Sequence, residues 1–300
     1  MRNPTDIGAA RQALGRVGAF LPNIPFAPAT PVTAQRHAVT RLERGGYTAL
    51  WVNEGVGGKD VFVQLATLLA ASERITFGSA VASIWARPPA TAHGAAALLE
   101  DAYPGRTVLG LGVGYPEQAA AVGSEFGRPL STMRRYLEQM DEPHAMTPAP
   151  DVTYPRILGA NGPRMLGLAG KLTDGAIPTL VPAEYTRRAR AILGPDKLLV
   201  VGLAVVADAD LGRARDTARL FASQTINRPG SPYAKNLADL GYTGDELVEA
   251  VVPYGGPAEI SAAIDTHLEA GADHVRISVA APDFAAGIDQ LEWLAGGIRN

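Results

Sequence analysis

Short apolar segments alternate with helical patterns along most of this 300-residue chain, and this alternation constrains the fold more than any other feature. Each apolar segment has the length of a buried strand, and a helical pattern follows most of them. Strands joined by helices run parallel in one sheet, and eight of them suggest closure into a barrel. We therefore expect an α/β fold, a (β/α)₈ TIM barrel formed by residues 1–300 as a single domain. A doubly wound open sheet is the alternative.

The expected strands are short and apolar, and they cover residues 17–21, 48–53, 75–83, 108–113, 156–160, 175–180, 198–207 and 274–280. Between the last two, residues 228–256 follow no regular pattern. We expect this segment to be an irregular insertion before the eighth strand.

The strand within residues 105–116, GRTVLGLGVGYP, carries no side chains on one face. Gly110, Gly112 and Gly114 alternate, so a planar ligand or another backbone can approach closely at the strand's carboxyl end. The spacing differs from the G-x-G-x-x-G dinucleotide fingerprint, and no helix opens on the third glycine. Glycines that ease the packing of a tight barrel are the other interpretation.

The composition excludes several classes of function. The chain has no cysteine, which excludes disulfides, thiolate metal sites and cysteine nucleophiles. Its net charge of −3 gives no reason to expect binding to nucleic acid or to an anionic membrane surface. No apolar run reaches the ~18–20 residues that span a bilayer. Since the first residues also lack the apolar core of a signal peptide, we expect a cytoplasmic protein.

In a barrel of this kind the site lies at the carboxyl ends of the strands. The polar and aromatic residues that the sequence places there are Asn53, Glu54, Ser83, Trp85, Arg87, Tyr115, Asn161 and Thr179, with Arg276 and Ser278 on one face of the eighth strand. The segment 159–163, Gly-Ala-Asn-Gly-Pro, leads from a strand into a helix. The free amides at a helix start suit a phosphate, although an ordinary N-cap asparagine explains the same pattern.

Histidines are absent from the carboxyl ends of the expected strands, and no zinc-binding histidine motif, acidic cluster or G-x-S-x-G elbow is present. Metal-dependent hydrolysis and acyl transfer therefore have no residues to carry them. A glycine-lined, aromatic and arginine-rimmed mouth beside a phosphate cradle indicates a cofactor that brings its own chemistry.

Several segments, in order along nearly the whole chain, resemble the bacterial luciferase-like superfamily. They are 78–89 (GSAVASIWARPP), 103–106 (YPGR) and 108–114 (VLGLGVG), together with 48–54, 159–176 and 271–275. Within the superfamily, the chain is most similar to actinobacterial oxidoreductases that use the deazaflavin coenzyme F420.

This resemblance implies a luciferase-like barrel with the cofactor ring across its mouth and a non-proline cis peptide between Ala80 and Val81. It also implies a phosphate at Asn161 and Gly162, and a homodimer. Position and resemblance together predict the cofactor-binding residues Ala80, Val81, Ser83, Arg87, Gly110, Gly112, Gly114, Ala160, Asn161, Gly162 and Thr179.

Two departures from the family's sugar-phosphate dehydrogenases affect the predicted chemistry. An Asp-His pair of those enzymes is replaced by Glu54-Gly55, and a glutamate after the glycine-rich strand is replaced by Tyr115. Their alcohol oxidation is therefore not expected here. Glu54 and Tyr115 remain the candidate proton donors.

We expect an F420-dependent oxidoreductase that transfers a hydride between the deazaflavin ring and a small organic substrate. Trp85, Tyr233 and Asn236 are expected to contact the substrate, with the insertion as a lid; a dimer contact or plain surface is the alternative for the insertion. Two other functions stay open. One is an FMN-dependent monooxygenase that uses oxygen and reduced flavin. For either enzyme, a separate F420 or flavin reductase is expected to supply the reduced cofactor. The other is a cofactor-binding protein without turnover.

Overall fold

The computed structural model describes residues 4–24, 27–143, 146, 148–226, 231–242 and 244–298. Its strands are β1 Val17–Phe20, β2 Ala49–Val52, β3 Thr76–Ser79, β4 Ala82–Ser83, β5 Thr107–Gly112, β6 Arg156–Gly159, β7 Gly175–Ile177, β8 Leu198–Ala207, β9 Tyr254–Gly255 and β10 His274–Val279. All the expected strands are present, and the third is divided into β3 and β4.

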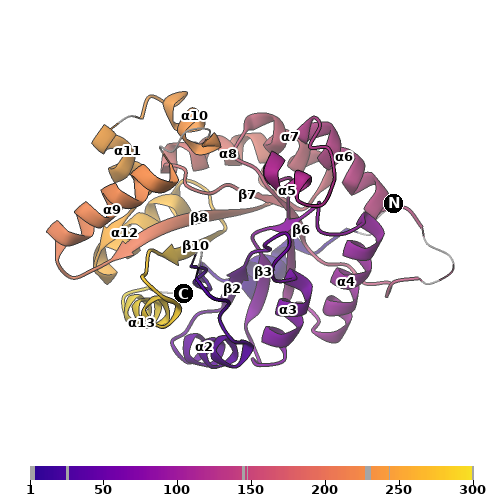
Figure 1. Cartoon of the computed structure of the whole chain (residues 1–300), viewed down its shortest axis with the longest axis horizontal. Helices are drawn as coiled ribbons and strands as arrows, with labels where there is room; N and C mark the ends of the chain where they lie inside the picture. The colour runs from indigo at the N-terminus through magenta and orange to yellow at the C-terminus, as the bar shows by residue number, and fades with distance from the viewer. Residues whose placement is uncertain are drawn as a thin grey trace.

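The strands form one parallel sheet that closes on itself (Figure 1). The order is β10-β1-β2-β3-β5-β6-β7-β8, and β10 also pairs with β8 along six residues to complete the ring. β4 continues the position of β3 and pairs with β5, whereas β9 extends the sheet beyond β8. The expected (β/α)₈ barrel is therefore confirmed, and the alternative of an open doubly wound sheet is wrong.

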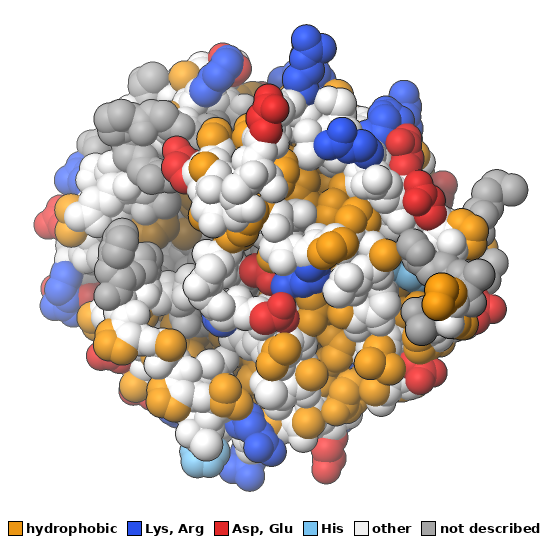
Figure 2. All heavy atoms as spheres, turned by 45° about the vertical axis from the view of Figure 1, so that its right-hand side comes forward, with side chains coloured by type: hydrophobic (Ala, Val, Ile, Leu, Met, Phe, Trp, Pro, Cys, Tyr) orange, Lys and Arg blue, Asp and Glu red, His pale blue; other side chains and the backbone are white. Residues whose placement is uncertain are grey.

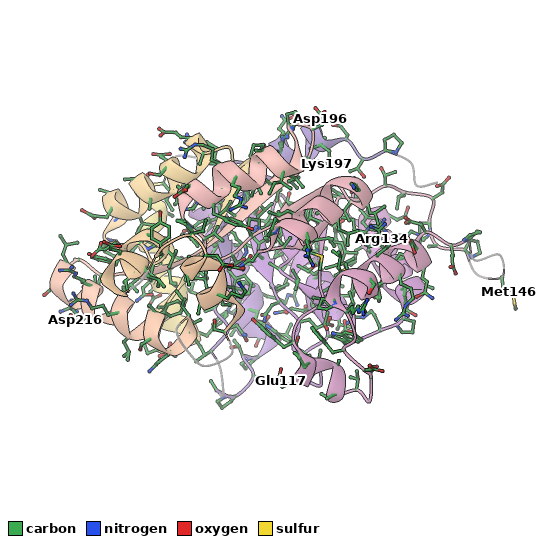
Figure 3. All side chains as sticks on the ribbon, turned by 90° about the horizontal axis from the view of Figure 1, so that it is seen from above. Glu117, Arg134, Met146, Asp196, Lys197 and Asp216 are labelled. Atoms are coloured by element: carbon green, nitrogen blue, oxygen red, sulfur yellow. The ribbon has the colours of Figure 1, made fainter. Side chains whose placement is uncertain are left out.

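Helices surround this barrel (Figure 1). They are α1 Ile7–Leu14, α2 Val32–Arg44, α3 Val61–Leu69, α4 Pro89–Ala102, α5 Pro116–Ala120, α6 Pro129–Met140, α7 Pro163–Leu172, α8 Ala183–Leu193, α9 Leu211–Thr225, α10 Pro232–Ala238, α11 Gly244–Val251, α12 Pro257–Glu269 and α13 Phe284–Ala295. Charged residues such as Glu117, Asp196 and Asp216 project from the outer surface (Figure 3).

Two apolar layers hold the barrel together, because successive side chains of a strand point to opposite faces. In β2, Leu50 and Val52 belong to the layer between strands and helices, whereas Trp51 points into the barrel. The Trp51 ring fits against its neighbour in register, Gly78 of β3, where a Cβ would lie only 2.2 Å from the ring. Trp51 Nε1 donates to Nε2 of His274 at 3.0 Å. The filled interior closes the barrel below the site.

The segment expected to be an irregular insertion is more regular than predicted. Its described part contains α10, α11 and β9, which pack on α9 and the end of β8 through a second apolar cluster. Leu247, Val248 and Val251 recur at helical spacing on α11 and are buried there. Residues 227–230 and 243, also part of this prediction, lie outside the described residues.

Part of the molecular surface is apolar. Hydrophobic side chains gather over a region of the face seen in Figure 2, next to a hollow where charged side chains of both signs meet. Val63 on α3 and Leu98 on α4 are among the exposed large hydrophobic residues. In the described ranges of the chain, no helix combines the length and apolar character that crossing a bilayer requires.

Candidate active site

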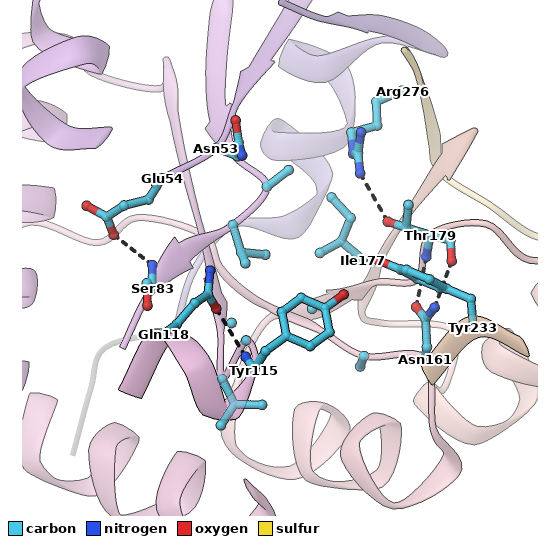
Figure 4. A pocket seen from close by; sticks show the side chains of 17 residues that line it. Asn53, Glu54, Ser83, Tyr115, Gln118, Asn161, Ile177, Thr179, Tyr233 and Arg276 are labelled. Carbon is cyan, nitrogen blue, oxygen red and sulfur yellow. Dashed lines mark hydrogen bonds between the residues drawn. The ribbon is translucent and has the colours of Figure 1, made fainter. Parts of the chain in front are cut away.

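A cavity of about 360 Å³ lies at the carboxyl ends of the barrel strands (Figure 4). This volume is near the lower end of the usual range for small-molecule sites. The cavity is lined by Asn53, Glu54, Ala80, Val81, Ser83, Gly112, Val113, Gly114, Tyr115, Gln118, Gly159, Ala160, Asn161, Ile177, Thr179, Tyr233 and Arg276.

The cavity brings together most of the site residues predicted from the sequence. Five of those residues are not part of its lining in the described structure: Trp85, Arg87, Gly110, Gly162 and Asn236. Trp85 lies close by, since its Nε1 donates to the carbonyl of Val113 at 2.6 Å.

The peptide bond between Ala80 and Val81 is cis, at the position that the family resemblance implies. The end of β2 holds this segment on both sides. Ala80 N donates to the carbonyl of Val52 at 2.7 Å, and Glu54 N donates to the carbonyl of Val81 at 3.2 Å. Ala80 and Val81 therefore form a fixed part of the cavity wall.

The alternating glycines of β5 serve the close approach of another segment. A Cβ on Gly110 would lie 2.1 Å from the carbonyl oxygen of Ser79, and one on Gly112 would lie 2.2 Å from Val81 Cγ2. Ser79 Oγ also bonds both backbone groups of Gly110, at 2.8 and 2.9 Å. Gly110 is thus packed against β3 and is not part of the cavity lining, so its contact with a cofactor stays a prediction. Gly114, with φ of +58°, adopts a conformation that favours glycine.

Glu54 is held in a buried ion pair. Its side chain is 2% exposed, and that of its partner Arg87 is 9% exposed. Nη1 and Nη2 of Arg87 donate to the carboxylate, and Ser83 N donates to Oε2 at 2.7 Å. Arg87 also pairs with Asp60 at 2.7 Å.

These contacts change the interpretation of two predicted residues. A carboxylate already occupied by charge-assisted donors fixes the backbone of Ser83 and is poorly placed to pass a proton to a substrate. Arg87 was predicted to bind the cofactor, and in the structure its guanidinium pairs with two carboxylates instead.

Tyr115, the other predicted proton donor, also lines the cavity. It precedes α5, and its backbone N donates to Gln118 Oε1 at 3.1 Å. Its ring reaches across the cavity toward Tyr233 and Thr179 (Figure 4). Of the two candidates, Tyr115 is therefore better placed to reach a substrate.

Asn161 connects the ends of β6 and β7. Its Nδ2 donates to the carbonyl of Thr179 at 2.7 Å, and its Oδ1 accepts from Thr179 N at 2.9 Å. The asparagine is not the helix cap either, because α7 has Gly162 as its N-cap. The Asn161 side chain thus bonds within the protein. At the start of α7, Pro163 has no N–H and Met165 N donates to the Gly162 carbonyl at 3.1 Å, so the amides of Gly162 and Arg164 are what this junction offers a phosphate. Asn236 of α10 donates to the Asn161 carbonyl at 3.3 Å, which places α10 beside this junction.

The sequence placed Arg276 at the carboxyl end of the eighth strand without assigning it a ligand, and the structure places it in the cavity wall. It is 6% exposed, and its Nη2 donates to Thr179 Oγ1 at 3.0 Å. Its guanidinium carbon lies 5.0 Å from the centre of the Phe20 ring. Burial lowers the pKa of Arg276 to about 10.

Two buried polar atoms of the lining, Asn53 Oδ1 and Arg276 Nε, have no hydrogen-bond partner within the described structure. One is an acceptor and the other a donor. A ligand with both kinds of group would satisfy them. No group of His, Asp and Glu side chains in the described part of the chain is arranged to hold a metal ion.

Comparison with known proteins places these features in context. The family profile described as "Luciferase-like monooxygenase" matches residues 15–274. The chain is 26% identical over 170 residues to 5,10-methylenetetrahydromethanopterin reductase of Methanolobus tindarius, covering 51% of this chain and 52% of that protein. It is 24% identical over 302 residues to F420-dependent glucose-6-phosphate dehydrogenase of Nakamurella multipartita, covering 88% of this chain and 87% of that protein. The match thus spans about half of the first relative's length and most of the second's.

Two solved structures share the fold over nearly their whole length. An F420-dependent secondary alcohol dehydrogenase, in complex with an F420-acetone adduct, superposes with a TM-score of 0.75 at 15% identity, covering 95% of this chain and 99% of that one. The FMN-bound oxygenating constituent of 3,6-diketocamphane monooxygenase from Pseudomonas putida superposes with a TM-score of 0.69 at 15% identity, covering 95% of this chain and 99% of that one.

Proposed function

The chain belongs to the luciferase-like monooxygenase family, and on this premise we propose that it is an oxidoreductase dependent on coenzyme F420. It transfers a hydride between the deazaflavin ring and a small organic substrate. The cavity at the carboxyl ends of the barrel strands is the observation that carries the proposal. Sequence relatives named for F420 support this cofactor.

The cavity residues fit a planar, polar-edged ring with a phosphate. Ala80 and Val81 offer a fixed apolar wall, and the partnerless Asn53 Oδ1 offers an acceptor to an N–H of the ring. Backbone amides where β6 leads into α7 offer a place for the phosphate. The Glu54–Arg87 pair supports this site indirectly, by fixing Ser83 through its backbone N–H.

When bound, F420 supplies the ring carbon that gives or takes the hydride. The protein's part is to bind and orient the substrate, to exclude water and to move a proton. We assign the proton transfer to the Tyr115 hydroxyl, which projects into the cavity (Figure 4). Tyr233 of α10 also lines the cavity and is proposed to cover the substrate. A homodimer and a separate reductase that regenerates the cofactor are part of the same proposal.

An FMN-dependent monooxygenase is the second candidate. It is favoured by the likeness of fold to an FMN-bound oxygenase component and by a cavity wall that suits either ring. Side-by-side titration of the purified protein with F420 and FMN, followed by tryptophan fluorescence, separates the two. Trp85 lies next to the cavity and should report binding.

Tight F420 binding with weak FMN binding is the expected result, and reduced F420 then serves to screen carbonyl and alkene substrates. The opposite preference favours the monooxygenase. Retained F420 without reduction of any substrate indicates a binding protein. If neither cofactor binds below about 100 μM, roughly −5.5 kcal/mol, the proposed function is overturned.

Tyr115→Phe tests the assigned proton donor. The variant keeps the ring that lines the cavity and loses only the hydroxyl, so the Kd for F420 should stay unchanged. Turnover should fall by about 10²–10⁴-fold, the usual contribution of general acid catalysis. Stopped-flow absorbance of F420 and equilibrium titration measure the two quantities. A variant that turns over at the wild-type rate would remove Tyr115 from the mechanism.

A further inference from the structure

Among the residues that the structure describes, Arg276 differs from the other well-buried arginines in having no carboxylate paired with it. Arg87 pairs with Glu54 and Asp60, and Arg156 pairs with Asp141 at 3.0 Å. Within the described residues, the one hydrogen bond of the Arg276 side chain goes to the neutral hydroxyl of Thr179. Its Nε is buried and has no partner there.

The barrel is shaped around this arginine. The residues in register with Arg276 on the two neighbouring strands are Gly18 of β1 and Gly202 of β8. A Cβ on Gly202 would lie 2.6 Å from Arg276 Nη2 and 2.7 Å from Thr179 Oγ1. Gly202 thus provides the space in which the guanidinium meets its acceptor. The acceptor is itself fixed, since Asn161 bonds both backbone groups of Thr179.

A buried positive charge without a counter-charge is unfavourable unless something compensates it. The Phe20 ring, 5.0 Å from the guanidinium carbon, offers only a weak cation–π contact. Because Arg276 lines the cavity, a ligand can reach it. A guanidinium matches a planar carboxylate with two parallel N–H···O bonds, and within the described residues Nε has no partner that such a bond would displace.

We propose that Arg276 is the anion-recognition residue of this cavity and that the substrate is a small molecule bearing a carboxylate. The substrate class rests on the proposed F420-dependent function, whereas anion binding by Arg276 does not. A phosphate of the cofactor is the other source of a negative oxygen. We favour the substrate because the amides before α7 offer the phosphate a separate place, and because 360 Å³ leaves space for only a small group beside a ring.

The test uses acetate, propanoate and butanoate as probes, each against its uncharged amide. Binding is followed by calorimetry and thermal shift, in the protein alone and in the protein saturated with oxidised F420. We compare wild type with Arg276→Met, which keeps much of the volume, and with Arg276→Lys, which keeps the charge and loses the planar fork. Arg213→Met, on the exposed side of α9, is the control for loss of a positive charge far from the site.

At least one carboxylate should bind wild type and the Arg213→Met variant, and its amide should bind at least tenfold more weakly. Arg276→Met should weaken the carboxylate by about 30-fold or more, with Arg276→Lys in between, while F420 affinity stays unchanged. If F420 affinity falls instead and no carboxylate binds wild type, Arg276 recognises the cofactor and the substrate class is overturned. If wild type binds neither carboxylates nor F420, both proposals fail.

The protein without cofactor separates the remaining outcomes. Suppose that the cofactor-free wild type binds a carboxylate, that Arg276→Met loses this binding, and that F420 does not bind. This result supports anion recognition by Arg276 and overturns only the proposed function. Should Arg276→Met fail to fold, the carboxylate-against-amide comparison on wild type and the Arg276→Lys variant still decide the question.

Discussion

A single hydrogen-to-methyl change at Gly112 tests the close approach between β5 and the segment beneath the cavity. In Gly112→Ala the new Cβ would lie 2.2 Å from Val81 Cγ2, so Val81 has to move. We expect a loss of about 1–3 kcal/mol in the free energy of unfolding and weaker F420 binding. Urea denaturation and fluorescence titration measure the two effects.

Removing the clashing group should reverse this loss. Gly112→Ala combined with Val81→Ala takes away the Cγ2 atom and leaves Val81 Cβ 3.1 Å from the new methyl, so the double variant should regain part of the lost stability. Gly94→Ala in α4 is the control, because no atom outside the helix's own backbone lies within 4 Å of its new Cβ. This variant should stabilise the helix by roughly 0.5–1 kcal/mol. A double variant as unstable as Gly112→Ala would show that the clash is not the cause.

The Glu54–Arg87 pair allows a second prediction at the residue scale. Arg87→Met leaves the Glu54 carboxylate buried with its main partner gone, so unfolding should become easier by about 3–5 kcal/mol. Glu54→Gln combined with Arg87→Met removes both charges and should be less destabilised than Arg87→Met alone. Denaturant titration of these two variants and of Glu54→Gln alone measures the coupling, and additive losses would contradict it.

The sequence indicated these residues but not their partners. Alternating glycines predicted that something approaches β5, yet Ser79 and Val81 lie about 30 residues earlier in the chain. Glu54 and Arg87 were expected as a proton donor and a cofactor ligand, and they are bound to each other across 33 residues. Pairings of this kind depend on which strand ends the barrel brings together, and no local pattern encodes them.

At the scale of elements, Asn161 carries the connection between the ends of β6 and β7. Asn161→Ala loses two hydrogen bonds to Thr179 and should cost about 1–3 kcal/mol. Asn161→Asp keeps the shape but places a carboxylate oxygen against the Thr179 carbonyl, so it should be destabilised more. Thermal and urea unfolding rank the two variants. An aspartate variant as stable as wild type would show that this bond does not hold the loop.

The element pattern was readable because strand and helix periods are local properties. Most predicted elements fall within a few residues of β1–β8, β10 and their helices. The exceptions are places where long-range contacts decide. The expected third strand is divided at the cis peptide, and α10 and α11 gain their stability from packing on α9 and β8. Sequence periodicity in 231–251 alone was too weak to show this.

At the scale of the whole molecule, the two ends of the barrel have separate tasks. The cavity occupies the carboxyl end, whereas His274 closes the interior from the amino-terminal part of β10. Trp51 Nε1 can only donate, so His274 Nε2 accepts and Nδ1 carries the proton given to the Gly15 carbonyl at 2.8 Å. His267 similarly joins α12 to α8 through Thr186 at 2.8 Å. The bonds of His274 thus require its neutral form.

The burial of both histidines predicts how the stability of the whole barrel depends on pH. Desolvation lowers the pKa of His267 and of His274 from 6.5 to about 4. Between those values the unfolded chain binds protons that the folded chain does not, so stability is full above pH 6.5 and falls as pH falls toward 4. Each histidine should account for about 3 kcal/mol over this window. Glu100, whose pKa is raised by desolvation, acts in the opposite direction, so variants are more informative than the total slope of stability against pH.

Urea unfolding at pH 7 and pH 5 should show a smaller drop in the free energy of unfolding for His267→Gln than for wild type. The drop should be unchanged for His37→Gln, on the exposed side of α2. An equal drop in all three proteins would mean that His267 titrates alike in both states, and that its burial does not set the acid limit of the fold.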